Sequence, residues 1–348
     1  MGLASQEAIN QFKALMDQVD EPLKKTFKLT KHCLLSLQNV HQGYIVETLE
    51  RFLKAREGNV AKAHKMLVDS LQWRLQNGID DILAKPIIPA NFYRGVRDSQ
   101  LIGVSGYTRE GLPVFAIGAG LSTFDKASIH YYVQSHIQIN EYRDRVILPA
   151  ATKKNGRYIG KCVKVLDMSG LKLSALNQIK LLTTISTIDD LNYPEKTITY
   201  YIVNVPYVFS ACWKVVKPLL QERTKLKVQV LQGGGRDELL KIMDYPSLPH
   251  FCRREGSGSG SGSGSSRHSD GGCYSLDHPF HQELYSYMKQ QSGCREPIEP
   301  AKQGSVHVDV ALGKPEEAEL CKTLESELKK LRNQKSLSGS LKNMKISD

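Results

Sequence analysis

Four short apolar runs, separated by segments of helical character, constrain the fold of this chain more than any other feature. The runs are rich in Val, Ile and Leu and lie at 113–117, 161–167, 199–205 and 226–231. Apolar residues follow one another in them with little interruption, which is typical of a mostly parallel sheet covered on both faces. Helices are expected at 125–147, 174–188, 207–220 and 237–243. This alternation predicts an α/β domain over residues 91–255, with right-handed crossovers between the strands.

The first 90 residues lack such runs and have a helical pattern instead. Apolar residues, among them Leu49 and Phe52, recur at helical spacing before Gly58, a residue suited to ending a helix. Asn59 can then cap the next helix with its side chain. We therefore predict an N-terminal helical subdomain at 1–90.

The C-terminal part of the chain has a different composition. Residues 256–272 are a Gly/Ser repeat, which is typical of a flexible linker that cannot form a core. Residues 273–348 are polar and broken by Gly and Pro, so we expect a low-complexity, largely disordered tail. Short helices are expected within it at 279–291 and 315–334, and the second is a candidate for binding a partner or another copy of the chain.

The charge balance indicates the kind of partner to expect. The chain has 47 Lys and Arg against 36 Asp and Glu, a formal net charge of +11. This excess favours anionic membrane surfaces and phosphorylated headgroups. A dense basic cluster with interleaved aromatic residues is missing from the sequence, so we do not expect nucleic acid as a partner.

Cysteine usage and hydropathy indicate the compartment. The seven cysteines are scattered and include no Cys-x-x-Cys pair, which argues against a disulfide framework or a zinc site and suits a reducing cytosol. The sequence contains no apolar run long enough to cross a membrane. The expected location is cytoplasmic, with reversible peripheral association with membranes.

The signatures of common enzymes are incomplete. Gly118-Ala119-Gly120 follows an apolar run, but the third glycine of a dinucleotide-binding loop is replaced, so a dehydrogenase is not favoured. The glycines at 233–235 lack the Lys-Ser/Thr ending of a P-loop. We expect a protein that is not an enzyme and that has neither a catalytic residue, a metal nor a cofactor.

Residues 191–232 combine charged and apolar features. Glu195 and Lys196 follow a Tyr-Pro turn, and Lys227 lies at the start of the last apolar run. The expected helix between them carries an apolar stripe that consists of Phe209, Cys212, Trp213, Val216 and Leu220. This stripe either covers the core or forms a lid over an apolar cavity, and periodicity alone leaves both possibilities open. Polar groups on either side of an apolar helix favour a lipid as the ligand.

Motifs spread over roughly residues 30–255 resemble those of the CRAL-TRIO lipid-binding family. They are LERFLKAR at 49–56, GLPV at 111–114, VLDMSG at 165–170, NYPE at 192–195 and KPLL at 217–220. They occur in the family's order and are most similar to the secretory phosphatidylinositol/phosphatidylcholine transfer branch.

The resemblance implies an α/β fold whose cavity encloses one phospholipid. The helix expected at 207–220 would be the gate of this cavity. It also implies a headgroup site formed by Arg56, Glu195, Lys196, Thr224 and Lys227. Cationic side chains suit a buried phosphodiester, because Arg offers a planar pair of donors and Lys a point charge. Glu195 either accepts hydrogen bonds from inositol hydroxyls or pairs with Arg56.

The sequence departs from the family where phosphatidylcholine-binding members place hydroxyl-bearing side chains around choline. The matching positions are Val104, Phe115, Tyr142, Cys162 and Lys164. Only Tyr142 keeps an aromatic hydroxyl, and aromatic faces are what attract quaternary ammonium groups. Phosphatidylcholine is therefore not favoured as a second ligand.

The resemblance leads to a functional expectation. The protein would bind phosphatidylinositol and exchange it between membranes, presenting it for vesicle trafficking or to a phosphoinositide kinase in signalling. The alternative is a non-transferring lipid sensor or adaptor that recruits partners through residues 273–348.

Overall fold

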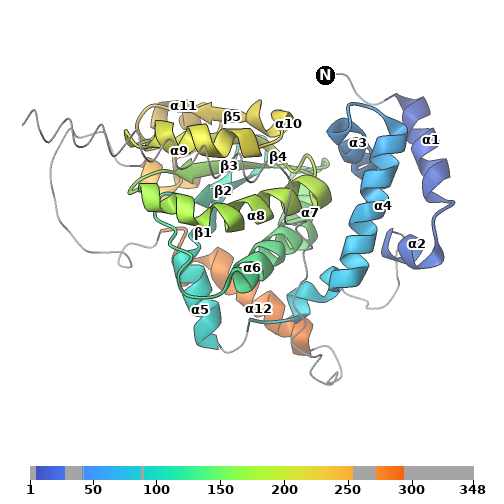
Figure 1. Ribbon diagram of the computed structural model, residues 1–348, viewed down its shortest axis with the longest axis horizontal. Coiled ribbons are helices and arrows are strands. Elements are labelled where there is room, and N and C mark those ends of the chain that lie inside the picture. Colours follow the sequence, from blue (N-terminus) through green and yellow to red (C-terminus); the bar gives the residue numbers. More distant parts are fainter. Residues whose placement is uncertain (1–4, 28–40, 42, 88–89, 254–271, 294–348) are drawn as a thin grey trace, which may run out of the picture.

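The computed structural model describes residues 5–27, 41, 43–87, 90–253 and 272–293. A group of helices from the N-terminal part lies beside a five-stranded sheet that has helices packed on it (Figure 1). This arrangement confirms the predicted α/β class with a helical N-terminal part.

The strands of the sheet lie side by side in chain order, β1-β2-β3-β4-β5. Their bounds are β1 Ile102–Tyr107, β2 Pro113–Ile117, β3 Cys162–Asp167, β4 Thr197–Val203 and β5 Val228–Val230. β2 to β5 are parallel and β1 is antiparallel to β2. The four predicted strands are present with small shifts at their ends. β1 was not predicted, because Gly103 and Gly106 interrupt its apolar pattern.

The two faces of the sheet have different neighbours, since successive residues of a strand point to opposite sides. One face, which carries Val163 and Val203, packs against α11 (Arg236–Leu240) and the turn after it. The opposite face, called the inner face below, carries Leu166 and Ile202 and points toward α8 and α9.

The four helices predicted for the α/β part are present with shifted ends, whereas the helices at 90–99, 148–155 and 222–225 were not predicted. The helices of the α/β part are α5 Ala90–Ser99, α6 Ile129–Tyr142, α7 Leu148–Asn155, α8 Ile179–Asn192, α9 Phe209–Val216, α10 Glu222–Lys225 and α11. A π-helical turn, Arg143–Ile147, joins α6 to α7. Short 3-10 turns are found at Ile79–Ala84, Leu173–Gln178, Lys217–Leu219, Tyr245–Ser247 and His250–Cys252.

The N-terminal helices form a core of their own. They are α1 Gln6–Met16, α2 Glu21–Phe27, α3 Ile45–Ala55 and α4 Val60–Asn77. Their buried residues, such as Leu49 and Phe52, belong to a single apolar cluster. Gly58 adopts a φ of 82° after α3, and the side chain of Asn59 accepts a hydrogen bond from the backbone N–H of Lys62. The sequence signals for the end of α3 and the start of α4 are thus correct.

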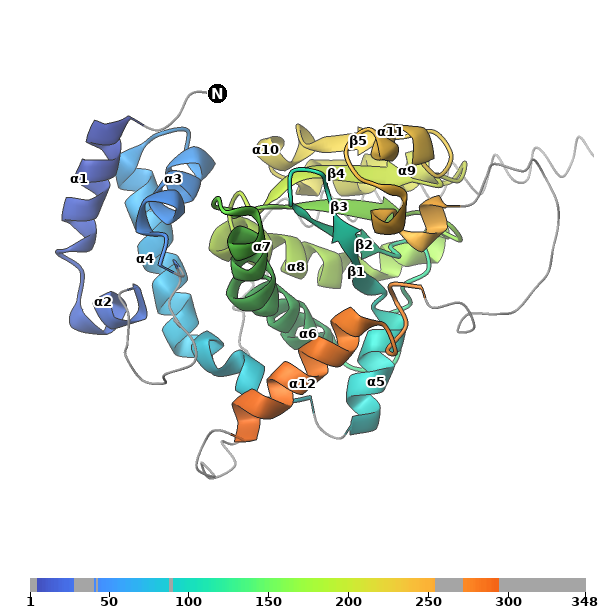
Figure 2. The same ribbon diagram turned by 180° about the vertical axis from the view of Figure 1, so that it is seen from behind.

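The C-terminal segment requires a correction. The helix expected at 279–291 is present as α12, Pro279–Gly293, but it packs into the main core instead of belonging to a separate tail. Figure 2 shows α12 lying across the base of the α/β part, near α5 and α6. Phe280, Leu284 and Met288 are buried in that core. Their spacing of four residues makes one apolar stripe, which the polar composition of this region obscured. The linker at 256–271 and the helix expected at 315–334 lie outside the described residues.

Docking of this segment depends on a glycine in β1. A side chain at Gly103 would overlap the carbonyl oxygen of Cys273, so the absence of a Cβ lets the backbone before α12 approach the strand. We call residues 272–293 the C-terminal strap.

We expect Gly103→Ala to loosen the C-terminal strap and to lower the free energy of unfolding by about 1–3 kcal/mol, because the added methyl group overpacks a backbone contact. Urea unfolding measures the loss, and hydrogen exchange should increase in residues 272–293. Gly234→Ala is the matched control, since its Cβ would have no neighbour closer than 3.5 Å. Equal exchange in the strap for both variants would contradict this explanation of Gly103.

Candidate functional site

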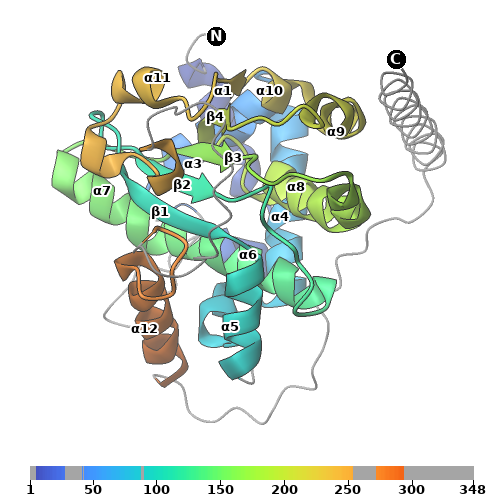
Figure 3. The same cartoon turned by 90° about the vertical axis from the view of Figure 1, so that its left-hand side faces the viewer.

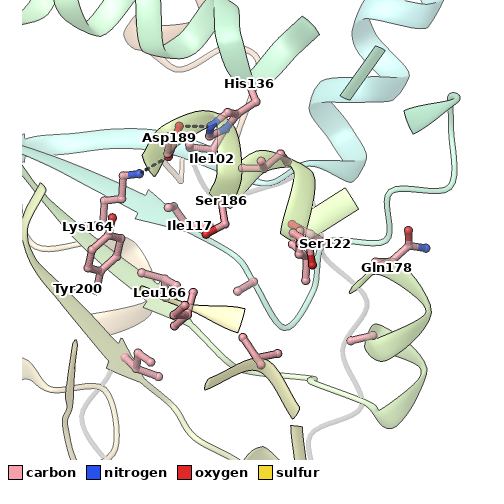
Figure 4. Close-up of a pocket in the computed structure, with 18 of the residues that line it drawn as sticks. Ile102, Ile117, Ser122, His136, Lys164, Leu166, Gln178, Ser186, Asp189 and Tyr200 are labelled. Carbon is pink, nitrogen blue, oxygen red and sulfur yellow. Dashed lines mark hydrogen bonds and ion pairs between the residues drawn. The ribbon is translucent and has the colours of Figure 1, made fainter. Parts of the chain in front are cut away.

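A cavity of about 350 Å³ lies between the inner face of the sheet and helices α8 and α9. Its wall is mainly apolar and includes Leu166 and Ile202 from the strands and Ile185 from α8. The volume is within the range of sites for small molecules. Figure 4 shows Ile117 and Leu166 on the strand side, with His136, Asp189, Lys164 and Tyr200 grouped at one end.

The predicted gate helix forms one wall of this cavity. It is shorter than the expected 207–220, since α9 spans Phe209–Val216 and a 3-10 turn follows. All five residues of the predicted stripe line the cavity: Phe209, Cys212, Trp213, Val216 and Leu220. The rings of Phe209 and Trp213 stack with centroids 5.7 Å apart. The stripe therefore covers a cavity, and its opening as a gate stays a prediction.

A second, polar pocket adjoins the apolar cavity. Six residues line both spaces: Arg143, Lys164, Asp189, Asp190, Tyr200 and Thr224. Among its charged lining residues the polar pocket has five basic side chains, from Arg143, Lys164, Lys196, Arg223 and Lys227, and three acidic ones, from Asp189, Asp190 and Glu195. An apolar space and a positively charged polar space thus meet at one wall.

Four of the five predicted headgroup residues line the polar pocket: Glu195, Lys196, Thr224 and Lys227. Glu195 is buried, with its Oε2 atom 3.0 Å from Lys227 Nζ and 3.6 Å from Lys54 Nζ. The pairing with Arg56 that we considered is therefore replaced by a pairing with two lysines. The Thr224 hydroxyl donates to Asp190 Oδ1 at 3.4 Å.

Arg56, the fifth predicted residue, lies beside the polar pocket but is not part of its lining. It follows the last residue of α3, and its Nη1 donates to the Ala55 carbonyl. Arg223 donates to the same carbonyl and to the carbonyl of Asp190. Arg56 and Arg223 thus converge on one carbonyl, and the pKa of Arg56 is lowered by burial and by the charge of Arg223, while Asp190 of the pocket lining opposes the shift.

Sequence reasoning missed several basic residues around the polar pocket. Arg51 is buried, and its Nη1 donates to the Pro194 carbonyl at 3.0 Å. Arg143 lies in the π-helical turn and contacts Asp144 at 2.7 Å. The signal for Arg51 was its position among the apolar residues of α3, where a charged side chain needs a special reason. No comparable signal marks Arg143 or Arg223.

A hydrogen-bonded cluster occupies the end of the cavity nearest the polar pocket. Asp189 Oδ1 accepts from Asn140 and lies 2.7 Å from His136 Nε2, and Asp189 Oδ2 is 3.4 Å from Lys164 Nζ (Figure 4). Lys164 also lies over the ring of Tyr200. Burial opposes the charge of Lys164, but Tyr200 and Asp189 raise its pKa to about 12. Lys164 is therefore a cation at the wall of an apolar space.

The positions that resemble a choline site are divided between two places. Phe115 and Lys164 line the cavity. Val104, Tyr142 and Cys162 belong to the adjoining hydrophobic core. The ring of Tyr142 contacts Phe280 and Tyr287 on α12, so its aromatic face is committed to the C-terminal strap.

No group of three or more His, Cys, Asp or Glu side chains among the described residues could hold a metal ion. Within the same residues, no helix combines the length and the apolar character needed to span a bilayer.

Comparison with known families adds an independent observation. Residues 97–252 match the CRAL/TRIO domain, and residues 8–69 match the CRAL/TRIO N-terminal domain. The chain belongs to the CRAL/TRIO family. The resemblance inferred from the motifs is thereby confirmed.

Curated CRAL/TRIO relatives include plant and fungal proteins. "Phosphatidylinositol/phosphatidylcholine transfer protein SFH9" of Arabidopsis thaliana is 29% identical over 255 residues, which cover 69% of this chain and 43% of the relative. "SEC14 cytosolic factor" of Eremothecium gossypii is 30% identical over 214 residues, covering 58% of this chain and 67% of the relative. The chain spans about two fifths of the length of the first plant relatives, 43% of SFH9 and 40% of SFH12.

A solved structure has a similar fold. The structure titled "Crystal structure of Sfh5" superimposes with a TM-score of 0.52 at 18% identity. The match covers 71% of this chain and 88% of that one. At this identity the likeness concerns the fold alone.

The most perturbed lysine of this CRAL/TRIO site is Lys196. It is buried 3.2 Å from Asp144 Oδ2. Burial and the charge of Arg51 lower its pKa to about 7, while Asp144 opposes this shift. An ordinary lysine in the unfolded chain has a pKa near 10.4. Between these two pH values the unfolded chain binds more protons than the folded one, so Lys196 makes stability rise with pH.

We expect Lys196→Met to reduce this rise by about 1 kcal/mol per pH unit between pH 7 and pH 9. Urea unfolding at pH 7, 8 and 9 measures the slope, and Asp144 keeps its contact with Arg143 in the variant. Lys241→Met, which alters an exposed lysine, should keep the wild-type slope. A wild-type slope in Lys196→Met would show that Lys196 does not titrate in this range.

Proposed function

We propose that this protein binds one phospholipid, phosphatidylinositol, and transfers it between membranes without covalent chemistry of its own. The observation that carries the proposal is the junction of an apolar cavity with a pocket of positive charge surplus. An amphiphile with acyl chains and an anionic headgroup matches both parts. The names of the CRAL/TRIO relatives, which refer to phosphatidylinositol and phosphatidylcholine transfer, support the same ligand class.

The polar pocket suits a phosphodiester. Lys227 and Lys54 share the carboxylate of Glu195, so neither lysine is neutralised by a partner of its own. Lys161 responds to this positive field, because burial and the charges of Lys54 and Lys227 lower its pKa. A phosphate oxygen would offer these cations charge-assisted hydrogen bonds, which are stronger than neutral ones. Glu195 can at the same time accept hydrogen bonds from sugar-alcohol hydroxyls.

The apolar wall suits reversible exchange at a membrane surface. Tyr207 is 82% exposed just before α9, and Leu226 is 78% exposed just after α10. Lys214 is exposed on α9 between the buried positions of the stripe. Exposed apolar side chains with nearby cations favour transient contact with anionic lipids. We propose that α9 moves outward in such a contact and admits the acyl chains.

Phosphatidylcholine is a less suitable ligand for this cavity. A quaternary ammonium needs ring faces or carboxylates, and here the cationic Lys164 lies at the cavity wall. The Asp189 carboxylate is already engaged by His136, Asn140 and Lys164. We propose that phosphatidylinositol is preferred over phosphatidylcholine.

We expect Lys227→Ala to reduce phosphatidylinositol transfer between vesicles about tenfold or more, the effect of losing one charge-assisted hydrogen bond. Arg56→Ala should weaken transfer less, since Arg56 is not among the described residues that line the polar pocket. Both variants should keep the wild-type melting temperature within a few degrees. Lys241→Ala is the matched control, because Lys241 is exposed and is not among the residues that line either pocket.

Wild-type transfer by Lys227→Ala would contradict the headgroup assignment. Lipid mass spectrometry of the purified protein tests the ligand class separately, with bound phosphatidylinositol as the expected result. Recovery of no phospholipid, together with no transfer by the wild type, would contradict the proposed function as a whole.

The proposed transfer activity can serve phosphoinositide signalling or vesicle trafficking if the bound lipid is presented to a kinase. A non-transferring adaptor would instead depend on the region after the C-terminal strap. We expect removal of residues 294–348 to leave vesicle transfer unchanged, because the described residues that line the two pockets all lie within 100–228. Transfer assays and cellular localisation of the truncated protein measure the two roles. Loss of transfer after this truncation would contradict the proposed division.

A further inference from the structure

The C-terminal strap covers a buried guanidinium that has no partner. Arg97, on α5, is 1% exposed. Its Nε, Nη1 and Nη2 atoms make no hydrogen bond, and it takes part in no ion pair within the described part of the chain. The other buried arginines of the described residues each make at least one hydrogen bond. They are Arg51, Arg74 and Arg143. Arg97 is therefore an exception that needs a physical explanation.

Two further polar groups without partners lie against Arg97. The guanidinium lies over the ring of Tyr93 at 5.2 Å, and the Tyr93 hydroxyl is buried without a hydrogen bond. His281 of α12 is 2% exposed, and neither of its ring nitrogens has a partner. Figure 3 shows α12 beside α5, as Figure 2 does from another side, and the charge of Arg97 acts on His281 across this contact.

The neighbouring polar side chains are already engaged. The Ser99 hydroxyl donates to the Gly95 carbonyl and contacts the Tyr132 hydroxyl. The Gln100 Oε1 atom accepts from Ser135. Burial, assisted by the positive charges of Arg97 and His278, lowers the pKa of His281 to about 3, although the backbone of Ile102 and of Cys273 opposes this shift, so His281 is neutral and adds no second charge. The site therefore contains donors in excess and one full positive charge.

Such an arrangement is costly unless a further group completes it. An arginine side chain stays charged at all physiological pH values, and an isolated buried charge is strongly unfavourable. The contact with the Tyr93 ring offsets only a part of this cost. Water molecules would satisfy the donors but would leave the charge unbalanced, whereas an anion satisfies both.

We propose that a compact inorganic anion, of the size of chloride or phosphate, binds Arg97 between α5 and α12. Tyr93 contributes its hydroxyl as a further donor, and His281 borders the site from α12. Neither these two residues nor Arg97 lines the apolar cavity or the polar pocket, so the anion site is separate from the lipid site. Because Arg97 is on α5 and His281 is on α12, the anion ties the C-terminal strap to the CRAL/TRIO domain.

Thermal unfolding at constant ionic strength tests the proposal. Potassium gluconate, whose anion is too large for a buried site, is replaced stepwise by potassium chloride or potassium phosphate. We expect at least one of the small anions to raise the wild-type melting temperature by about 5 °C at a saturating concentration. The anion that does so is the ligand. Equal melting temperatures in all three salts would overturn the proposal and leave water as the occupant.

Variants assign the effect to Arg97. Arg97→Met is expected to fold, since it removes an unbalanced buried charge, and to show no anion-specific shift. Arg94→Met is the matched control on the same helix, because Arg94 is exposed, and it should shift as the wild type does. An anion shift retained in Arg97→Met would overturn the assignment.

A direct measurement does not depend on any variant. If chloride is the ligand, crystals of the wild-type protein soaked in bromide should show an anomalous peak beside the Arg97 guanidinium. Hydrogen exchange in residues 272–293 should also be slower in the stabilising salt than in gluconate. If phosphate is the stabilising anion, the same position should hold tetrahedral density in crystals grown with phosphate. Solvent density alone at this position would overturn the proposal.

Discussion

The arrangement of the whole molecule depends on the buried carboxylate of Glu141. Its oxygens accept from Arg74 of α4, from Arg145 in the π-helical turn and from the Tyr193 hydroxyl, all at 2.6–3.0 Å. The two arginines hold the pKa of Glu141 far below its ordinary value, although burial opposes this. One charged group on α6 thus joins the helical N-terminal part, through Arg74, to the Tyr-Pro turn, through Tyr193. Every donor around it has an acceptor, so the network is suited to holding a fixed geometry.

The polar pocket differs from this network in how well its charges are matched. Glu195 is shared by Lys54 and Lys227, and the hydroxyl of Thr224 reaches Asp190 only at 3.4 Å. Basic side chains outnumber acidic ones in the lining. A fully satisfied cluster resists change, whereas an excess of donors leaves free energy to be gained from a ligand. The two polar clusters therefore have different roles, although Tyr193 and Glu195 are only two residues apart in the chain.

The sequence predicted those parts of the fold that local patterns determine. The apolar run at Pro113–Ile117 is a strand with the expected bounds, and the Gly58-Asn59 signal marks a real helix boundary. The strand with Gly103 was missed, because its stability comes from pairing with β2 and from the strap and not from its own pattern. For the site, the sequence indicated which residue types gather. It could not indicate that Glu195 pairs with Lys54 and Lys227, since that depends on how three distant segments pack.

The backbone at Glu195 explains how two neighbouring residues of one short motif reach different partners. Glu195 has a φ of 61°, in the left-handed region that a non-glycine residue rarely adopts and that costs on the order of 1 kcal/mol or more. Arg51 stabilises the turn by donating to the Pro194 carbonyl. The reversal separates neighbouring side chains, because Glu195 contacts Lys54 and Lys227 while Lys196 contacts Asp144. This conformation directs the Glu195 carboxylate to the place where the polar pocket needs an acceptor among its cations.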